Sequence, residues 1–155
     1  MPVTRLTNLL SDEHIDYVTI PHTTSYTAQE TAASAHVRGI EFAKTVIVKI
    51  DGKLAMAVLP AQYRIHLGLL KHETQASRVE IAAEDDFRGF FPGCETGAMP
   101  PFGNLYGMDV YVEDSLLNDE VIAFNAGSHR EIVKLSYQDY MRLVQPKIAR
   151  FTTVH

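Results

Sequence analysis

The stretch from residue 92 to 104, PGCETGAMPPFGN, has the residue types of a ligand-binding loop. It holds three glycines, three prolines and the only cysteine of the chain, with no lysine or arginine. Pro100 and Pro101 lack N–H donors and restrict the residues before them to extended conformations, whereas Gly97, Ala98 and Met99 keep their donors. This pattern predicts a rigid run of backbone amides held close to a ligand. The alternative is a stiff surface loop that covers an edge of the core.

Lys44 begins an apolar strand pattern, KTVIVKI. Alternate residues of a strand share a face, so Lys44 should lie on the same face as Val46, Val48 and Ile50. If that face is buried, the ammonium opens onto the core side at the sheet edge and needs an anionic partner or a wet cavity. The alternative is a lysine at a strand end that reaches out to solvent.

The other candidate residues are His129 and Cys94. The seven histidines form no H-x-x-x-H pair and the chain has no C-x-x-C, so we predict no metal site. His129 follows the apolar run VIAFNAG at an expected hairpin tip, where it could face a site or simply be a solvated turn residue. Cys94 could be a nucleophile, but a small apolar filler is the simpler interpretation. No phosphate-binding glycine motif is present, so no nucleotide cofactor is predicted.

Short elements should position these residues. Asp51-Gly52 between two apolar runs predicts a hairpin, and Ser136 with Asp139 predicts the start of a final helix that ends before Pro146. A capping box at Thr27 predicts another helix. The hydrophobic patterns predict helices near 3–10, 27–37, 63–71, 83–91 and 137–145, and strands near 15–20, 44–50, 54–60, 78–82, 109–114, 121–127 and 131–136.

Composition is ordinary for a globular protein, and the predicted strands, short helices and hairpins together indicate the mixed α+β class, with short helices around a largely antiparallel sheet. With 155 residues, 46% of them hydrophobic, and no linker or repeat, we expect a single domain over residues 1–155. No apolar run is long enough to span a membrane and the N-terminus lacks signal-peptide features, so we expect a cytoplasmic protein. The formal net charge of −5 argues against a broad nucleic-acid-coating surface.

Four segments, in this order, resemble the YbaK and prolyl-tRNA synthetase-associated editing domains. IPHTTSYTAQETA is similar to the family's entry into its first helix, and FAKTVIVKIDGKLAMAVLPA to its lysine-bearing hairpin. TGAMPPFG fits the family's G-x-x-x-P loop, with Gly97 and Pro101 as the fixed ends, and FNAGSHREIVKLSYQDYMRL is similar to its final hairpin and helix. The resemblance extends over residues 3 to 145. It implies an α+β fold whose mixed, largely antiparallel sheet is partly barrel-like.

The resemblance also implies a function: trans-editing, the hydrolysis of the ester between a wrong amino acid and the 3′ adenosine of tRNA, which maintains translation fidelity. An activated ester needs positioning and oxyanion stabilisation more than a nucleophilic side chain. Lys44 corresponds to the family's essential lysine, which holds anionic groups of the terminal nucleotide. The implied partners are the tRNA acceptor end and a synthetase, with no cofactor. The implied substrate-binding residues are Gly97, Ala98, Met99, Pro100, Pro101, Phe102, Gly103 and His129.

Two loop positions depart from the family pattern. Many free-standing members have a second glycine and a serine where this chain has Ala98 and Pro100, which predicts a narrower cradle. We therefore expect small aminoacyl groups, alanine first and then serine or proline. The alternative is a non-catalytic module of the same fold that binds a tRNA end, a nucleotide or a protein, and the negative net charge favours it.

Overall fold

The computed structural model describes residues 4–21, 42–118 and 120–154. The helix expected at 27–37 and most of the IPHTTSYTAQETA segment lie outside the described residues.

The central sheet has five strands in the order β5-β2-β3-β6-β9. Its main hairpin joins β2 (Ala43–Ile50) to β3 (Lys53–Pro60), as predicted. Asp51 and Gly52 form the turn with φ of 50° and 83°, the left-handed values that a two-residue hairpin turn requires. β5 (Val79–Ile81) pairs with β2 in antiparallel fashion, whereas β6 (Asp109–Glu113) and β9 (Lys147–Ala149) add in parallel. The sheet is therefore mixed.

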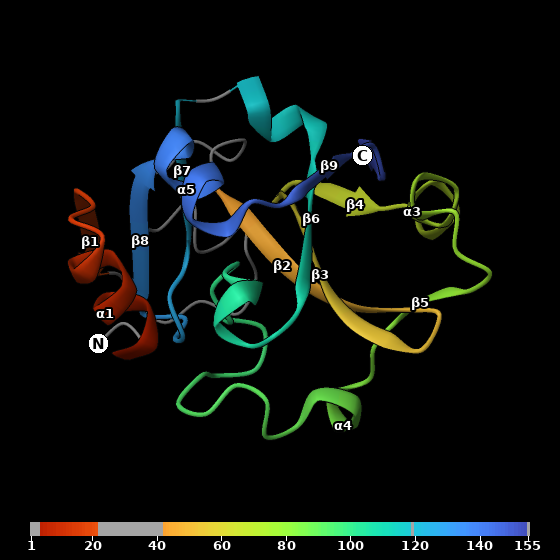
Figure 1. Ribbon diagram of the computed structural model, residues 1–155, viewed down its shortest axis with the longest axis horizontal. Helices are drawn as coiled ribbons and strands as arrows, with labels where there is room; N and C mark the ends of the chain where they lie inside the picture. Colours follow the sequence, from red (N-terminus) through yellow and green to blue (C-terminus); the bar gives the residue numbers. More distant parts are fainter. Residues whose placement is uncertain (1–3, 22–41, 119, 155) are drawn as a thin grey trace.

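Two smaller sheets flank the central one. β1 (Tyr17–Pro21), β8 (Glu131–Ser136) and β7 (Val121–Asn125) form an antiparallel sheet, in the order β1-β8-β7. β4 (Tyr63–Ile65) pairs with β10 (Thr152–Val154). A parallel bridge between Phe42 and Ala123 joins the start of β2 to β7. In Figure 1 the three-stranded sheet lies at the left of the central strands and β4 at their right.

Four α-helices and two 3₁₀ turns complete the described part of the chain. Helix α1 lies beside the three-stranded sheet and α3 at the opposite side of the molecule (Figure 1). None of the helices in the described ranges is long and apolar enough to cross a membrane. Their bounds are α1 (Thr4–Asp12), α3 (Leu67–Thr74), α4 (Glu84–Phe87), α5 (Tyr137–Val144), η1 (Gly103–Leu105) and η2 (Asp114–Asn118).

Two sequence-based boundaries are wrong. The helix predicted over 63–71 begins only at Leu67, with His66 as its N-cap, because residues 63–65 pair with β10, more than 80 residues later. The helix predicted over 83–91 stops at Phe87, since Arg88 is extended and Gly89 has a φ of 85°. In the first case a distant strand partner overrides local pattern, and in the second a glycine ends the helix early.

The main hydrophobic core lies between the central sheet and the elements α1, β7, β8 and α5. Met99 and Phe102, from the irregular segment between α4 and β6, are part of it. A second buried cluster covers the other face of β2 and β3, against β4 and α3. These layers confirm the predicted mixed α+β class.

Candidate functional site

The glycine- and proline-rich loop is tied to the connection between β7 and β8. The amide of Glu95 donates to the carbonyl oxygen of Gly127 at 2.7 Å. The amide of Gly127 donates in turn to the carbonyl oxygen of Ala98 at 2.8 Å. Because both bonds run between backbone groups, they hold the path of the loop whatever the side chains are. The structure thus brings together two segments that the sequence places about 30 residues apart.

His129 reinforces this junction. Its Nε2 lies 3.0 Å from the carbonyl oxygen of Thr96. The adjacent Gly97 has a φ of 82°, and a Cβ placed there would lie 3.7 Å from Cε1 of His129. The glycine is therefore required by its backbone conformation rather than by lack of space. Gly97 is exposed, and the imidazole forms a wall beside it.

The rest of the loop is buried. The sequence instead predicts a run of backbone amides held close to a ligand. Residues 98–103 are all buried. Phe102 packs against the rings of Phe124 and Tyr140, with ring centroids 5.5 and 5.3 Å away. A Cβ on Gly103 would lie 2.5 Å from the carbonyl oxygen of Met108. Phe102 and Gly103 thus serve packing, and of the predicted substrate-binding loop residues only Gly97 has an exposed position.

The amides of the loop differ in their hydrogen bonds. The N–H of Ala98, predicted to face a ligand, instead donates to the carbonyl oxygen of Glu95 at 3.0 Å. The amides of Gly97 and Met99 donate to no backbone carbonyl in the described part of the chain. Backbone amides held in fixed directions suit the stabilisation of a developing oxyanion.

Tyr140 holds the loop through a hydrogen bond to its backbone. This tyrosine of α5 is fully buried, and its hydroxyl donates to the carbonyl oxygen of Pro101 at 2.7 Å. Local sequence pattern predicts the helix that carries Tyr140 but not this hydrogen bond, because Pro101 lies 39 residues away. The only signal was a tyrosine, a residue that needs a hydrogen-bond partner when buried, on an apolar helix face.

Lys44 occupies the predicted face of β2. Val46, Val48 and Ile50, on the same face, pack on the second buried cluster, and Lys44 itself is half-buried. Burial lowers the pKa of the Lys44 ammonium, and the charge of Arg64 lowers it further. None of the salt bridges within the described residues involves Lys44. The structure therefore presents a partly desolvated cation that lacks an ion-pair partner there.

Cys94 lies on the α4 side of the loop. It is half-buried, its sulfur lies 3.8 Å from the hydroxyl of Tyr106, and burial raises the pKa of its thiol. It lines a cavity of about 160 Å³ between α4 and the loop. A buried thiol with a raised pKa is a poor nucleophile near neutral pH, since the thiolate is the reactive form.

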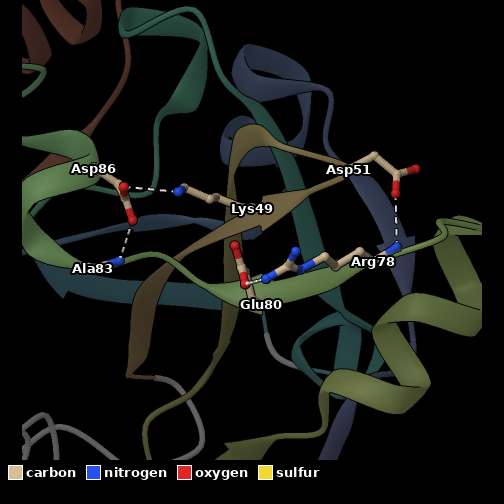
Figure 2. A network of polar contacts seen from close by, with 6 residues as sticks. All are labelled: Lys49, Asp51, Arg78, Glu80, Ala83 and Asp86. Carbon is tan, nitrogen blue, oxygen red and sulfur yellow. Dashed lines mark hydrogen bonds and ion pairs between the residues drawn. The ribbon is translucent and has the colours of Figure 1, made fainter.

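The position of α4 depends on one carboxylate. Figure 2 shows Asp86 of α4 between Lys49 of β2 and the backbone of Ala83, at 2.9 and 2.8 Å. The Lys49 ammonium, which bonds this carboxylate, holds the pKa of Asp86 below its usual range, with a further contribution from the Ala83 amide. Nearby, Asp51 of the hairpin turn accepts from the amide of Arg78 at 2.9 Å, which aligns β5 with β2 (Figure 2). This network fixes the helix that forms one wall of the cavity.

Comparison with known proteins assigns the family. The model of the aminoacyl-tRNA editing domain matches residues 22–143, which include Lys44, the loop and His129. The chain therefore belongs to the aminoacyl-tRNA editing domain family. No curated protein matches it in sequence.

Solved structures share the fold at low identity. The hypothetical protein APE2540 is similar with a TM-score of 0.84 and 18% identity, over 96% of this chain and 99% of that one. A candidate trans-editing enzyme for prolyl-tRNA synthetase is similar with a TM-score of 0.80 and 18% identity, over 96% and 95%. At this identity the likeness establishes the fold, which matches the expected editing-domain architecture.

Proposed function

We propose that the protein is an aminoacyl-tRNA deacylase that hydrolyses, in trans, the ester of a mischarged tRNA. The observation that carries the proposal is the match to the editing-domain family over a region that includes Lys44 and the Gly97–Pro101 loop. The geometry supports it: a half-buried cation without an ion-pair partner among the described residues is suited to an anionic ligand, and the amides of Gly97 and Met99 donate to no backbone carbonyl among those residues.

The roles follow from the chemistry of an ester. Lys44 binds an anionic group of the terminal nucleotide at the tRNA acceptor end. Water attacks the carbonyl carbon, the carbonyl oxygen takes up negative charge, and the bond to the ribose oxygen then breaks as that oxygen receives a proton. The amides of Gly97 and Met99 stabilise the oxyanion, which requires little more than correct positioning. No side-chain nucleophile is needed.

We further propose that the edited amino acid is small, with alanine preferred over serine and proline. The imidazole beside Gly97 limits the space next to the exposed amide. The Ala98 side chain does not set this size limit, contrary to the prediction from the sequence, because its methyl group is buried in the protein. A hydrophobic pocket distinguishes one methylene by only about 1–3 kcal/mol, so exclusion of large groups must be steric.

Deacylation of a panel of mischarged tRNAs by wild type and Lys44→Ala tests the proposal. We expect hydrolysis of alanyl-tRNA faster than seryl and prolyl, little with phenylalanyl, and loss of activity in Lys44→Ala. Because burial disfavours the charged form of Lys44, its removal should leave the urea unfolding midpoint unchanged or higher. Equal rates for all four esters would contradict the size limit. Binding of tRNA without hydrolysis by wild type would instead support the non-catalytic module.

A further inference from the structure

Asn125 is the last residue of β7 and lies close in the chain to the connection that binds the glycine- and proline-rich loop. Gly127, two residues later, makes both backbone bonds to the loop. Along β7, Phe124 and Ala126 face the main core. Asn125 therefore faces the opposite side of the strand, together with Ala123.

The face of β7 that carries Asn125 is on the same side of the junction as the face of β2 that carries Lys44. Phe42 and Ala123 are bridged in parallel and share a small buried cluster. From this bridge β2 and β7 run in the same direction, and Lys44 and Asn125 each follow by two residues. Both side chains consequently leave their strands on the face where Phe42 and Ala123 meet. The register thus places an ammonium and an amide at the same end of the junction.

The two ends of the Asn125 amide have different surroundings. Its Oδ1 is shielded from solvent and accepts no hydrogen bond. The residue as a whole is half-buried, and its Nδ2 group, which makes no hydrogen bond with another described residue, is not among the shielded polar atoms. A buried acceptor without a donor is unfavourable for the folded protein, and such groups concentrate where function requires them. An exposed amide N–H₂ offers donors and no negative charge.

We infer that Asn125 is an oxyanion-stabilising residue, whose Nδ2 donates to the ester carbonyl oxygen of the aminoacyl group. The inference rests on the proposed deacylase function and extends it. When water adds to the carbonyl carbon, the C=O electron pair moves to this oxygen, and the hydrogen bond from Nδ2 strengthens as the negative charge on the oxygen grows. On collapse the pair returns, the ester C–O bond breaks, and the proton from water reaches the ribose oxygen. Asn125 neither gains nor loses a proton.

Steady-state deacylation by Asn125→Ala and Asn125→Asp tests the inference, on the aminoacyl-tRNA that wild type hydrolyses fastest. Loss of one oxyanion donor lowers kcat by about 10²–10³-fold with little change in KM. Asn125→Asp, which keeps the shape but places a carboxylate against the oxyanion, should lose at least as much. The urea midpoint of Asn125→Ala should equal or exceed that of wild type, because Oδ1 has no hydrogen bond to lose. Asn8→Ala, at an exposed position of α1, is the matched control and should keep full activity.

The outcomes separate this inference from the function on which it rests. If wild type hydrolyses the ester, Lys44→Ala does not, and Asn125→Ala retains full kcat, the inference is wrong and the deacylase function stands. A raised KM with unchanged kcat in Asn125→Ala would also overturn it, because it would show ground-state binding. A lower midpoint that accounts for the lost activity would show a structural role. No hydrolysis by wild type would overturn both.

Discussion

At the scale of single residues, the candidate site combines groups that the fold leaves unsatisfied. Burial lowers the pKa of the Lys44 ammonium, and no carboxylate among the described residues forms a salt bridge with it. The Oδ1 atom of Asn125 is buried and accepts no hydrogen bond from the described residues. Each is unfavourable for the folded protein on its own. Natural proteins keep such groups where function requires them, and the strand register that follows from the Phe42–Ala123 bridge places both on one side of the junction.

Cys94 is predicted to be dispensable for activity. Burial raises the pKa of its thiol, so little thiolate exists near neutral pH, and the sulfur lies beside the Tyr106 hydroxyl. Cys94→Ala should therefore keep kcat/KM for deacylation within a few-fold of wild type. Treatment of wild type with iodoacetamide at pH 7 is the accompanying measurement and should leave most activity. A loss of several orders of magnitude in the variant would establish a thiol mechanism instead.

At the scale of elements, the loop acts as a spacer between the core and the site. Met99 and Phe102 face the main core, α5 holds Pro101 through Tyr140, and the β7–β8 connection holds Glu95 and Ala98. Gly97 is left at the exposed tip. The path of the loop thus depends on the main core, on α5 and on the β7–β8 connection. A change in any of these three should alter the positions of the Gly97 and Met99 amides.

Tyr140→Phe should loosen the loop. The change leaves the buried carbonyl of Pro101 without its donor, so we expect a loss of about 1–3 kcal/mol in the free energy of unfolding, with a lower kcat. Urea denaturation and deacylation assays measure the two effects. Tyr137→Phe is a matched control on the same helix, because the buried Tyr137 hydroxyl has no hydrogen-bond partner. Equal destabilisation by both variants would contradict a specific role for the Pro101 bond.

At the scale of the whole molecule, charge limits how the protein can bind tRNA. The formal net charge of −5 argues against an extended basic surface, so we expect most of the tRNA body to contribute little to binding. Recognition should depend on the acceptor end, where Lys44 supplies positive charge.

The salt dependence of tRNA binding should therefore be shallow. Counterion release scales with the number of phosphates neutralised, and we expect about two to four contacts in the slope of log affinity against log salt concentration. Fluorescence anisotropy with an acceptor-stem oligonucleotide and with full-length tRNA would measure it. The two RNAs should give similar slopes. A slope typical of about ten phosphate contacts would reveal a basic surface that net charge does not predict.

The sequence by itself determined those features that depend on neighbouring residues. Asp51-Gly52 specified the β2–β3 hairpin, because glycine accepts the left-handed turn, and Ser136 capped α5 by accepting from the amide of Asp139. The alternation of β2 correctly placed Lys44 on the face of its valines. Residue types singled out the loop and His129 as candidates, and the family resemblance implied a role for them in substrate binding.

Only the tertiary structure decided what depends on distant partners. It buried residues 98–103, left the amides of Gly97 and Met99 without a backbone acceptor among the described residues, and placed Asn125 on the side of Lys44 through the Phe42–Ala123 bridge. It also turned residues 63–65 into a strand, because β10 supplies their hydrogen bonds. Burial and backbone pairing are properties of groups far apart in the chain. Local pattern therefore specifies which residues could act, and packing specifies which of their atoms remain accessible to a substrate.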